Sequence, residues 1–177
     1  NTVTLVIGGG GAATIDAGAV TLGNSGQAAT EDATLTLTAG TFTCDSLTIV
    51  GGSADGAATT LTVDTTLTVE GDLSIDNDND ADEVAISGAS AINVGGDFGV
   101  ETCSENVATV APTGTITLNG TASEDQTFTQ PAGSDLTGAT LVIDTVSTQE
   151  TVLANAISVD ALTVNADSIL DSNDNDV

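Results

Sequence analysis

The chain has 177 residues and carries 26 Asp and Glu but no Lys, Arg or His, so its formal net charge is −26 at pH 7. Without a basic side chain it cannot build a Ser-His-Asp or Cys-His nucleophile system, and we expect no enzymatic activity. Nucleic acid and anionic membranes are also expected to be excluded as partners, because binding to their phosphates is carried mainly by Lys and Arg.

The composition nevertheless predicts a folded protein. Hydrophobic residues make up 40% of the chain, which is too many for a disordered acidic tail. Aromatic residues make up only 2%, so the core must be built from Val, Leu, Ile and Ala. Apolar residues alternate with polar ones, most often Thr, along much of the sequence, a pattern typical of half-buried strands. We therefore expect an all-β fold that needs salt or bound cations to offset its charge.

The first predicted strand consists of Thr2, Val3, Thr4, Leu5, Val6 and Ile7, and four glycines follow it at positions 8–11. A strand on a flexible tether can pair with the sheet edge of a neighbouring subunit. This divides the chain into residues 1–11, a candidate donor strand and hinge for assembly, and residues 12–177, a β-rich repeat body. In the alternative, the strand is the first coil of that body and the glycines form a corner.

Threonines recur in the strands that come next, at Thr34, Thr36, Thr38, Thr41 and Thr43. They resemble the flat threonine arrays of ice-binding solenoids, but their Thr-x-Thr pairs do not follow one strict period. Thr is also favoured at any outward strand position because of its β-propensity. The sequence favours this ordinary explanation over ice binding.

The chain contains two cysteines, Cys44 and Cys103. An isolated pair in an extracellular protein predicts a disulfide, which would stabilise the fold by closing a long loop. In the alternative, both are buried reduced thiols that pack as small apolar residues.

A degenerate internal repeat runs through the chain. The segment Leu67–Ile75 matches Ile92–Val100 at a shift of 25 residues, and Phe42–Ile49 matches Ile157–Val164 position by position. Each unit consists of a short strand, a tight corner at Asp or Gly, and a second short strand. Repeats of this length indicate stacked coils, so we predict a parallel β-solenoid. One or two antiparallel β-sandwiches are the alternative, although these usually contain a large aromatic core residue.

Two acidic segments suggest metal binding, because their oxygen ligands alternate as in calcium loops. The predicted calcium ligands are Asp76, Asp78, Asp80, Asp82 and Glu83 in the first segment, and Asp171, Asp174 and Asp176 in the second. The first segment has Ala81 where an EF-hand has Gly and lacks the final Glu, and in the alternative it is a solvated acidic loop between coils. The second segment is a second site or one completed by the next subunit, and in the alternative it is a frayed chain end.

The segments Gly114–Gly120, Gln126–Thr129, Leu141–Ile143 and Ala156–Val164 carry a resemblance to known proteins. They resemble the repeats of bacterial surface β-helix proteins, the filamentous-haemagglutinin-like and autotransporter-passenger-like adhesins and fibres. The resemblance extends loosely over residues 33–170, and the complete lack of Lys and Arg departs from it. It implies a secreted, elongated scaffold used for adhesion or surface structure.

Together these features predict a non-enzymatic extracellular structural protein of the cell surface. We expect copies of the chain to form a filament or surface layer through strand edges, with Ca²⁺ bridging carboxylates that would otherwise repel. The alternative is an adhesive binding module, such as a segment of an adhesin or phage fibre, that binds a glycan or a surface ligand.

Overall fold

A computed structural model describes residues 2–8, 14–24, 32–51, 58–77, 83–103, 109–120, 124–130, 136–146 and 148–173. These residues form 17 strands and no helix. The described part of the chain therefore has no helix long and apolar enough to cross a membrane. Every strand pairing in it is parallel. The predicted parallel β-solenoid is confirmed, and the antiparallel sandwich is excluded.

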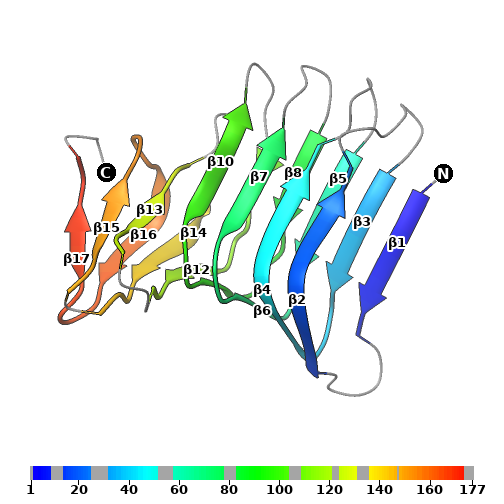
Figure 1. Ribbon diagram of the computed structural model, residues 1–177, viewed down its shortest axis with the longest axis horizontal. Coiled ribbons are helices and arrows are strands. Elements are labelled where there is room, and N and C mark those ends of the chain that lie inside the picture. The colour runs from blue at the N-terminus through cyan, green and yellow to red at the C-terminus, as the bar shows by residue number, and fades with distance from the viewer. Residues whose placement is uncertain are drawn as a thin grey trace.

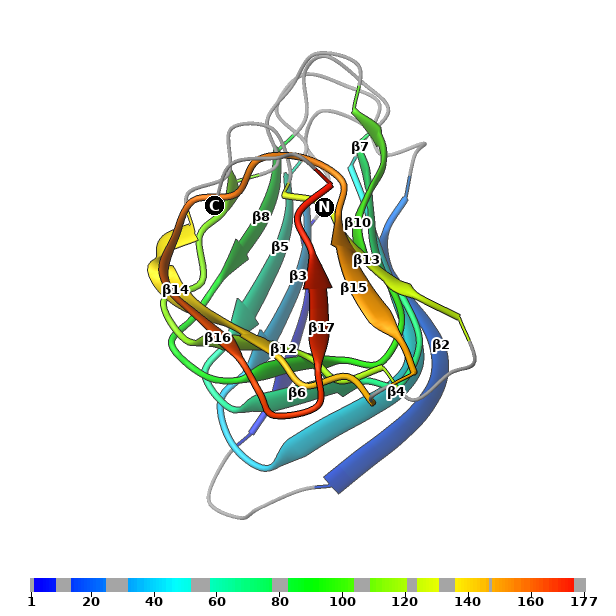
Figure 2. The same cartoon turned by 90° about the vertical axis from the view of Figure 1, so that its left-hand side faces the viewer.

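The strands wind around a long axis as three faces, seen side-on in Figure 1 and end-on in Figure 2. Face A consists of β1 (Thr2–Ile7), β3 (Asp32–Leu37), β5 (Ala58–Val63), β8 (Glu83–Ser87) and β11 (Thr109–Val110). Face B consists of the first parts of β2 (Thr14–Gly23) and β4 (Thr41–Val50), then β6 (Thr66–Val69), β9 (Ile92–Val94), β12 (Thr115–Leu118), β14 (Leu136–Ile143) and β16 (Val159–Val164). Face C consists of the second parts of β2 and β4, then β7 (Leu73–Asn77), β10 (Phe98–Cys103), β13 (Gln126–Phe128), β15 (Glu150–Leu153) and β17 (Ile169–Asp171).

The register confirms the repeat of 25 residues and corrects the second sequence match. Leu67 lies beside Ile92 on face B, and Leu73 lies beside Phe98 on face C. The match of Phe42–Ile49 to Ile157–Val164 would place Leu162 in the column of Leu47. Leu162 instead lies beside Leu141 on face B, whereas Leu47 belongs to face C. The match was wrong because a strand–corner–strand unit occurs at more than one corner of a coil, so similar segments can belong to different corners.

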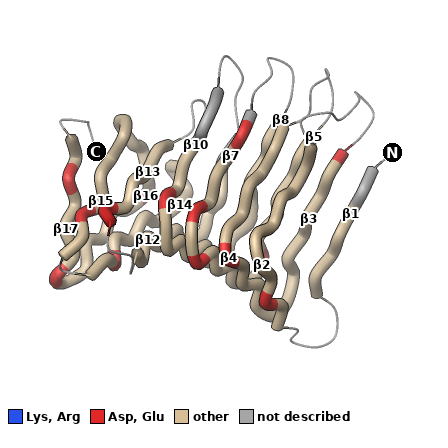
Figure 3. The backbone as a smooth tube through the Cα atoms, in the orientation of Figure 1, with Lys and Arg blue, Asp and Glu red and all other residues tan. Residues whose placement is uncertain are grey.

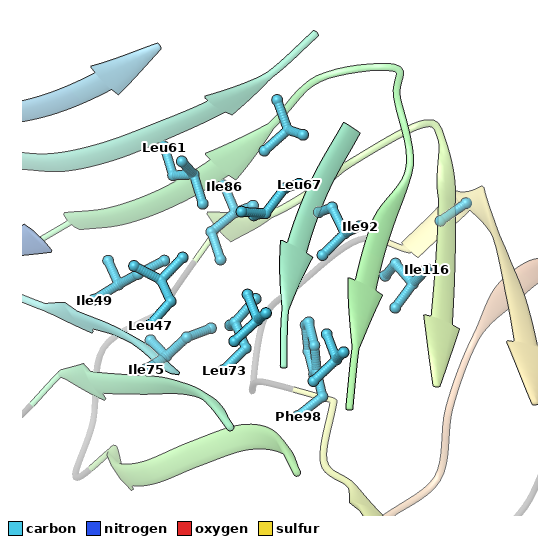
Figure 4. Close-up of a cluster of buried hydrophobic side chains, with 14 of the residues drawn as sticks. Leu47, Ile49, Leu61, Leu67, Leu73, Ile75, Ile86, Ile92, Phe98 and Ile116 are labelled. Atoms are coloured by element: carbon cyan, nitrogen blue, oxygen red, sulfur yellow. The ribbon is translucent and has the colours of Figure 1, made fainter. Parts of the chain in front are cut away.

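The core is a stack of aliphatic side chains that point inward from all three faces (Figure 4). On face B, Leu67, Ile92 and Ile116 lie one above another and are almost completely buried. On face C the rings of Phe98 and Phe128 stack with their centroids 4.9 Å apart. Burying one such side chain stabilises the fold by about 1.5–3 kcal/mol. Stacking therefore gives a solid interior although the chain has only three Phe and no other aromatic residue.

Glycine permits close contact between coils at two corners. Gly88, after β8, has a φ of 119°, and a Cβ there would lie 2.1 Å from the carbonyl oxygen of Val63. Between faces B and C, a Cβ on Gly95 would lie 2.1 Å from the carbonyl oxygen of Glu70. A side chain at either position would push neighbouring coils apart.

The N-terminal strand belongs to the chain's own solenoid. β1 pairs with β3 along its whole length, from Thr2 beside Asp32 to Ile7 beside Leu37. It occupies the position of a first coil, as in the alternative interpretation of this strand. Gly8 is described, with its backbone against Thr38, whereas glycines 9–11 of the candidate hinge lie outside the described residues. Exchange of this strand between subunits stays a prediction.

Candidate functional site

The predicted calcium ligands are only partly covered by the structure. Asp78, Asp80, Asp82, Asp174 and Asp176 lie outside the described residues, and only the backbone of Glu83 is described. Asp76 lies near the end of β7 beside Val50. Asp171 lies in β17, where its Oδ1 accepts a hydrogen bond from the backbone N–H of Asn173 at 2.8 Å. Within the described ranges, no three carboxylate or thiol side chains are grouped as a metal site. Calcium binding therefore stays a prediction.

A ladder of carboxylates that sequence reasoning missed connects successive coils. Asp72 Oδ1 accepts a hydrogen bond from the backbone N–H of Asp97 at 2.9 Å, and Asp97 Oδ1 accepts one from the backbone N–H of Thr127 at 2.7 Å. Further along, Asp125 Oδ1 accepts from the backbone N–H of Glu150 at 3.0 Å. Such charge-assisted hydrogen bonds are stronger than neutral ones, so backbone N–H groups here solvate carboxylates that have no cationic side chain. Gly-Asp before an apolar residue was the signal for Asp72 and Asp97, whereas Asp125 lies between Glu124 and Gln126 and carries no such signal.

A shallow polar cavity of about 170 Å³ opens on face C beside this ladder. Its polar lining consists of Asp72, Ser74, Asp97, Thr127 and Thr129. The cavity exists because Gly99 occupies a position where the neighbouring coils carry the side chains of Ser74 and Thr129. Its lining contains hydroxyls and carboxylates but no cationic side chain, so it can form hydrogen bonds with a hydroxylated ligand.

The threonines form columns across the coils, not along the chain. Thr34 and Thr36 lie on face A, Thr41 and Thr43 lie on face B, and the Thr38 hydroxyl at the corner donates to the carbonyl of Ile7 at 3.4 Å. The run that resembles an ice-binding array is therefore split between two faces. On face B, however, the outward positions of successive coils continue the pattern in two columns. The first column holds Thr14, Thr41, Thr66, Ala91, Thr115, Thr140 and Ala161, and the second holds Asp16, Thr43, Thr68, Asn93, Thr117, Val142 and Thr163.

Cys44 is a buried free thiol, as in the alternative to the disulfide. It lies in the interior column between Ala17 and Val69. Burial, and then the negative charges of Asp45 and Glu70, raise the pKa of the Cys44 thiol to about 11. A thiol of this kind stays protonated at neutral pH and is a poor nucleophile.

The predicted disulfide between Cys44 and Cys103 is not formed. Cys44 belongs to the face B part of β4, whereas Cys103 lies beside Asn77 at the far end of face C. The strand from Leu47 to Val50 alone spans roughly 10 Å. A disulfide needs Cα atoms within about 7 Å of each other. The sequence could not reveal this separation, because it depends on where the chain turns from one face to the next.

The two end coils leave inward-facing side chains uncovered. Leu5 lies beside the buried Leu35 but is itself 56% exposed. At the opposite end, Val164 lies beside the buried Ile143 and is 44% exposed. The outer edges of the end strands also have unpaired backbone groups, which can accept a further strand.

The molecule thus offers four features: open ends, a carboxylate ladder, a shallow polar cavity and a threonine-covered face. The described residues of these features carry carboxylate, hydroxyl and aliphatic side chains. Their chemistry is suited to surface contacts. Comparisons with protein-family models, curated proteins and solved structures find no match to this chain.

Proposed function

We propose that this chain is a non-enzymatic extracellular structural protein that forms the repeating unit of a filament or surface layer. The observation that carries the proposal is the pair of uncovered end coils. A solenoid repeats by translation, so a coil of one copy can stack on the end coil of another in the same way as coils stack within a chain. Such a head-to-tail contact does not close on itself, and it therefore grows into a filament.

The side chains at the two ends belong to the same columns. Ile15 at one end and Leu162 at the other are the first and last members of one inward column on face B. Ala17 and Val164 are related in the same way. A second copy that places β2 beside β16 would pair Ile15 with Leu162 and Ala17 with Val164, with the strands parallel as in the interior. The contact would bury aliphatic side chains and pair the open strand edges, as in β-augmentation.

The negative charge of the chain opposes assembly unless cations from the solution offset it. Each copy carries a net charge of −26 and has no basic side chain that could form an ion pair across the contact. Repulsion between copies must therefore be offset by salt or by divalent cations. We propose Ca²⁺ bridging of carboxylates, which fits an extracellular protein because calcium is abundant there and binds oxygen ligands.

Sedimentation velocity and negative-stain microscopy of the purified chain would test the proposal, with added Ca²⁺, with EDTA, and with matched NaCl. We expect rods that lengthen with Ca²⁺ and shorten with EDTA. The variant Val164→Asp should remain monomeric, because it places a charge in the uncovered end column. Val146→Asp is the control for added charge, because Val146 is similarly exposed, at 46%, but lies at the bend between β14 and β15 and not in an end strand. A chain that remains monomeric under all these conditions would contradict the proposal.

An adhesive binding module is the second candidate, and the polar cavity on face C favours it. Its hydroxyl and carboxylate lining can accept hydrogen bonds from a glycan. A glycan array distinguishes the two functions, because an adhesin segment should bind a glycan while it remains monomeric with Ca²⁺.

A further inference from the structure

The outward positions of face B form a two-column lattice. Thr41 and Thr43 lie two residues apart on one strand, which corresponds to roughly 6.6 Å. Each has a threonine beside it on the next coil, Thr66 and Thr68, at a strand spacing of about 4.8 Å. At β12, Thr115 and Thr117 are also two residues apart, and Thr115 lies beside Thr140, whereas Thr117 lies between Asn93 and Val142. Polar atoms at these separations repeat on the same scale as water oxygens on an ice surface.

This lattice is uncharged although the chain is a polyanion. From β4 to β16 the two columns contain Thr, Asn, Ala and Val, and the nearest charge within them is Asp16 on the first coil. Figure 3 shows Asp and Glu residues mainly at bends of the chain and near strand ends. Asp45 and Glu70, for example, lie at the corner between faces B and C. A neutral face favours ordered water over counterions and their hydration shells.

The lattice is also held in place. The side chains of Thr41, Thr43, Thr66 and Thr68 are half-buried between their neighbours, and a β-branched side chain has few χ1 rotamers. Asn93 replaces a threonine in the second column and donates from Nδ2 to the Thr68 Oγ1 at 3.5 Å. Each threonine offers a methyl group and a hydroxyl at a fixed position, so little conformational entropy is lost when an ordered layer settles on them.

We propose that face B is an ice-binding surface, with its threonine hydroxyls taking positions of lattice water and its methyl groups ordering water between them. Face A is less suited, because its described stack has five strands and Asp32 occupies an outward position of β3. A crystalline polysaccharide would be the other regular partner. Binding of that kind commonly relies on exposed aromatic rings, whereas the chain has no Trp or Tyr and its three Phe are buried.

The inference is independent of end-to-end assembly and is tested on the monomeric chain in EDTA. Nanolitre osmometry measures thermal hysteresis and the shape of single ice crystals. The variants Thr68→Tyr and Thr117→Tyr place a bulky ring in the middle of the lattice. Thr48→Tyr is the matched control, because Thr48 is a half-buried outward threonine of face C. Circular dichroism is the folding control, and we expect all variants to keep the melting temperature of the wild type.

We expect the wild-type chain and Thr48→Tyr to facet ice crystals and show thermal hysteresis, and both face B variants to lose these effects. Absence of faceting and hysteresis in the wild-type chain would overturn the proposal. Undiminished activity in both face B variants would also overturn it, because ice would then bind elsewhere. Retention on crystalline chitin or cellulose without any effect on ice would identify face B as a polysaccharide surface instead.

Discussion

The interior of the solenoid differs between its two halves. Up to β12 the described inward positions are nearly all aliphatic, and Thr59 is the one buried polar side chain among them. Between β13 and β15, by contrast, Gln126, Thr145, Gln149 and Thr151 are all buried. The spacing of coils changes in the same region, from 25 residues between Leu67 and Ile92 to 30 between Phe98 and Phe128. Buried polar groups therefore accompany the irregular coils.

The hydrogen bonds of these side chains explain how the irregular half is tolerated. Gln126 Nε2 donates to the carbonyls of Val94, at 2.8 Å, and Gly96, while its Oε1 accepts from the Gly120 N–H at 3.2 Å. Gln149 Nε2 donates to the carbonyl of Glu124 at 2.7 Å. Among the described residues, however, Gln149 Oε1 and Thr151 Oγ1 have no partner. Solenoid stability is approximately a sum over neighbouring coils, so we expect the β13–β15 region to unfold first.

The largest effect should come from a cavity in the aliphatic half. Leu73→Ala removes a fully buried side chain between Leu47 and Phe98, and we expect the free energy of unfolding to fall by about 2–5 kcal/mol. Urea denaturation measures this change. Ser74→Ala is the control, because Ser74 is half-buried on the outward side, and its effect should stay within about 0.5 kcal/mol. Equal effects of the two substitutions would mean that stacking of the aliphatic column does not stabilise this half.

The second-largest loss of stability should come from a substitution at a corner where two coils lie very close together. Gly88→Ala places a Cβ 2.1 Å from the Val63 carbonyl oxygen at a φ of 119°, so we expect a loss of about 1–3 kcal/mol in the free energy of unfolding. Gly18→Ala is the matched control, since the nearest atom to its Cβ would be Asp45 Oδ2 at 3.8 Å. Thermal denaturation measures the melting temperatures of the two variants. A melting temperature lowered equally by both substitutions would show that the corner contact is not responsible.

Alkaline pH should weaken the aliphatic half through Cys44. Its pKa is about 11 in the folded chain against the ordinary value of 9.0, so below pH 9 the thiol is protonated in both states. Between pH 9 and 11 only the unfolded chain releases this proton, and the free energy of unfolding therefore falls as pH rises. The chain has no Lys or Tyr that would titrate in this range. Urea denaturation at stepped pH should show the decline in the wild type and a flatter profile in Cys44→Ala. An equal decline in both would contradict the assignment to Cys44.

The smallest effect should be a gain of stability in the polar half. Thr151→Val keeps the shape of the side chain and removes a buried hydroxyl without a protein partner, so we expect about 1 kcal/mol of added stability. Thr127→Val changes a half-buried outward hydroxyl and should alter stability by less than about 0.5 kcal/mol. Hydrogen exchange would show whether the gain is confined to residues near β15. Destabilisation by Thr151→Val would mean that this hydroxyl is hydrogen-bonded in solution.

The sequence predicted the regular features well because they are local. Alternation of Thr with aliphatic residues identified the strands, and the shift between Leu67 and Ile92 identified a coil. The threonine columns and the separation of Cys44 from Cys103 could not be predicted in the same way. They depend on register across coils, whose length varies from 19 residues between Glu150 and Ile169 to 30 between Phe98 and Phe128. The extra or missing residues lie in the connections between strands. Residues at irregular spacings in the sequence can therefore lie at regular spacings across the coils.

The constant register of the central coils makes the molecule adjustable in length. Leu67 and Ile92 are equivalent positions one coil apart, as are Leu73 and Phe98. Tandem duplication of residues 67–91 would therefore insert one complete coil and lengthen the rod by about 4.8 Å. Every column on the three faces would continue through the insert. The length of the rod can therefore be changed, by evolution or by a protein engineer, in steps of one coil without any change to the two ends.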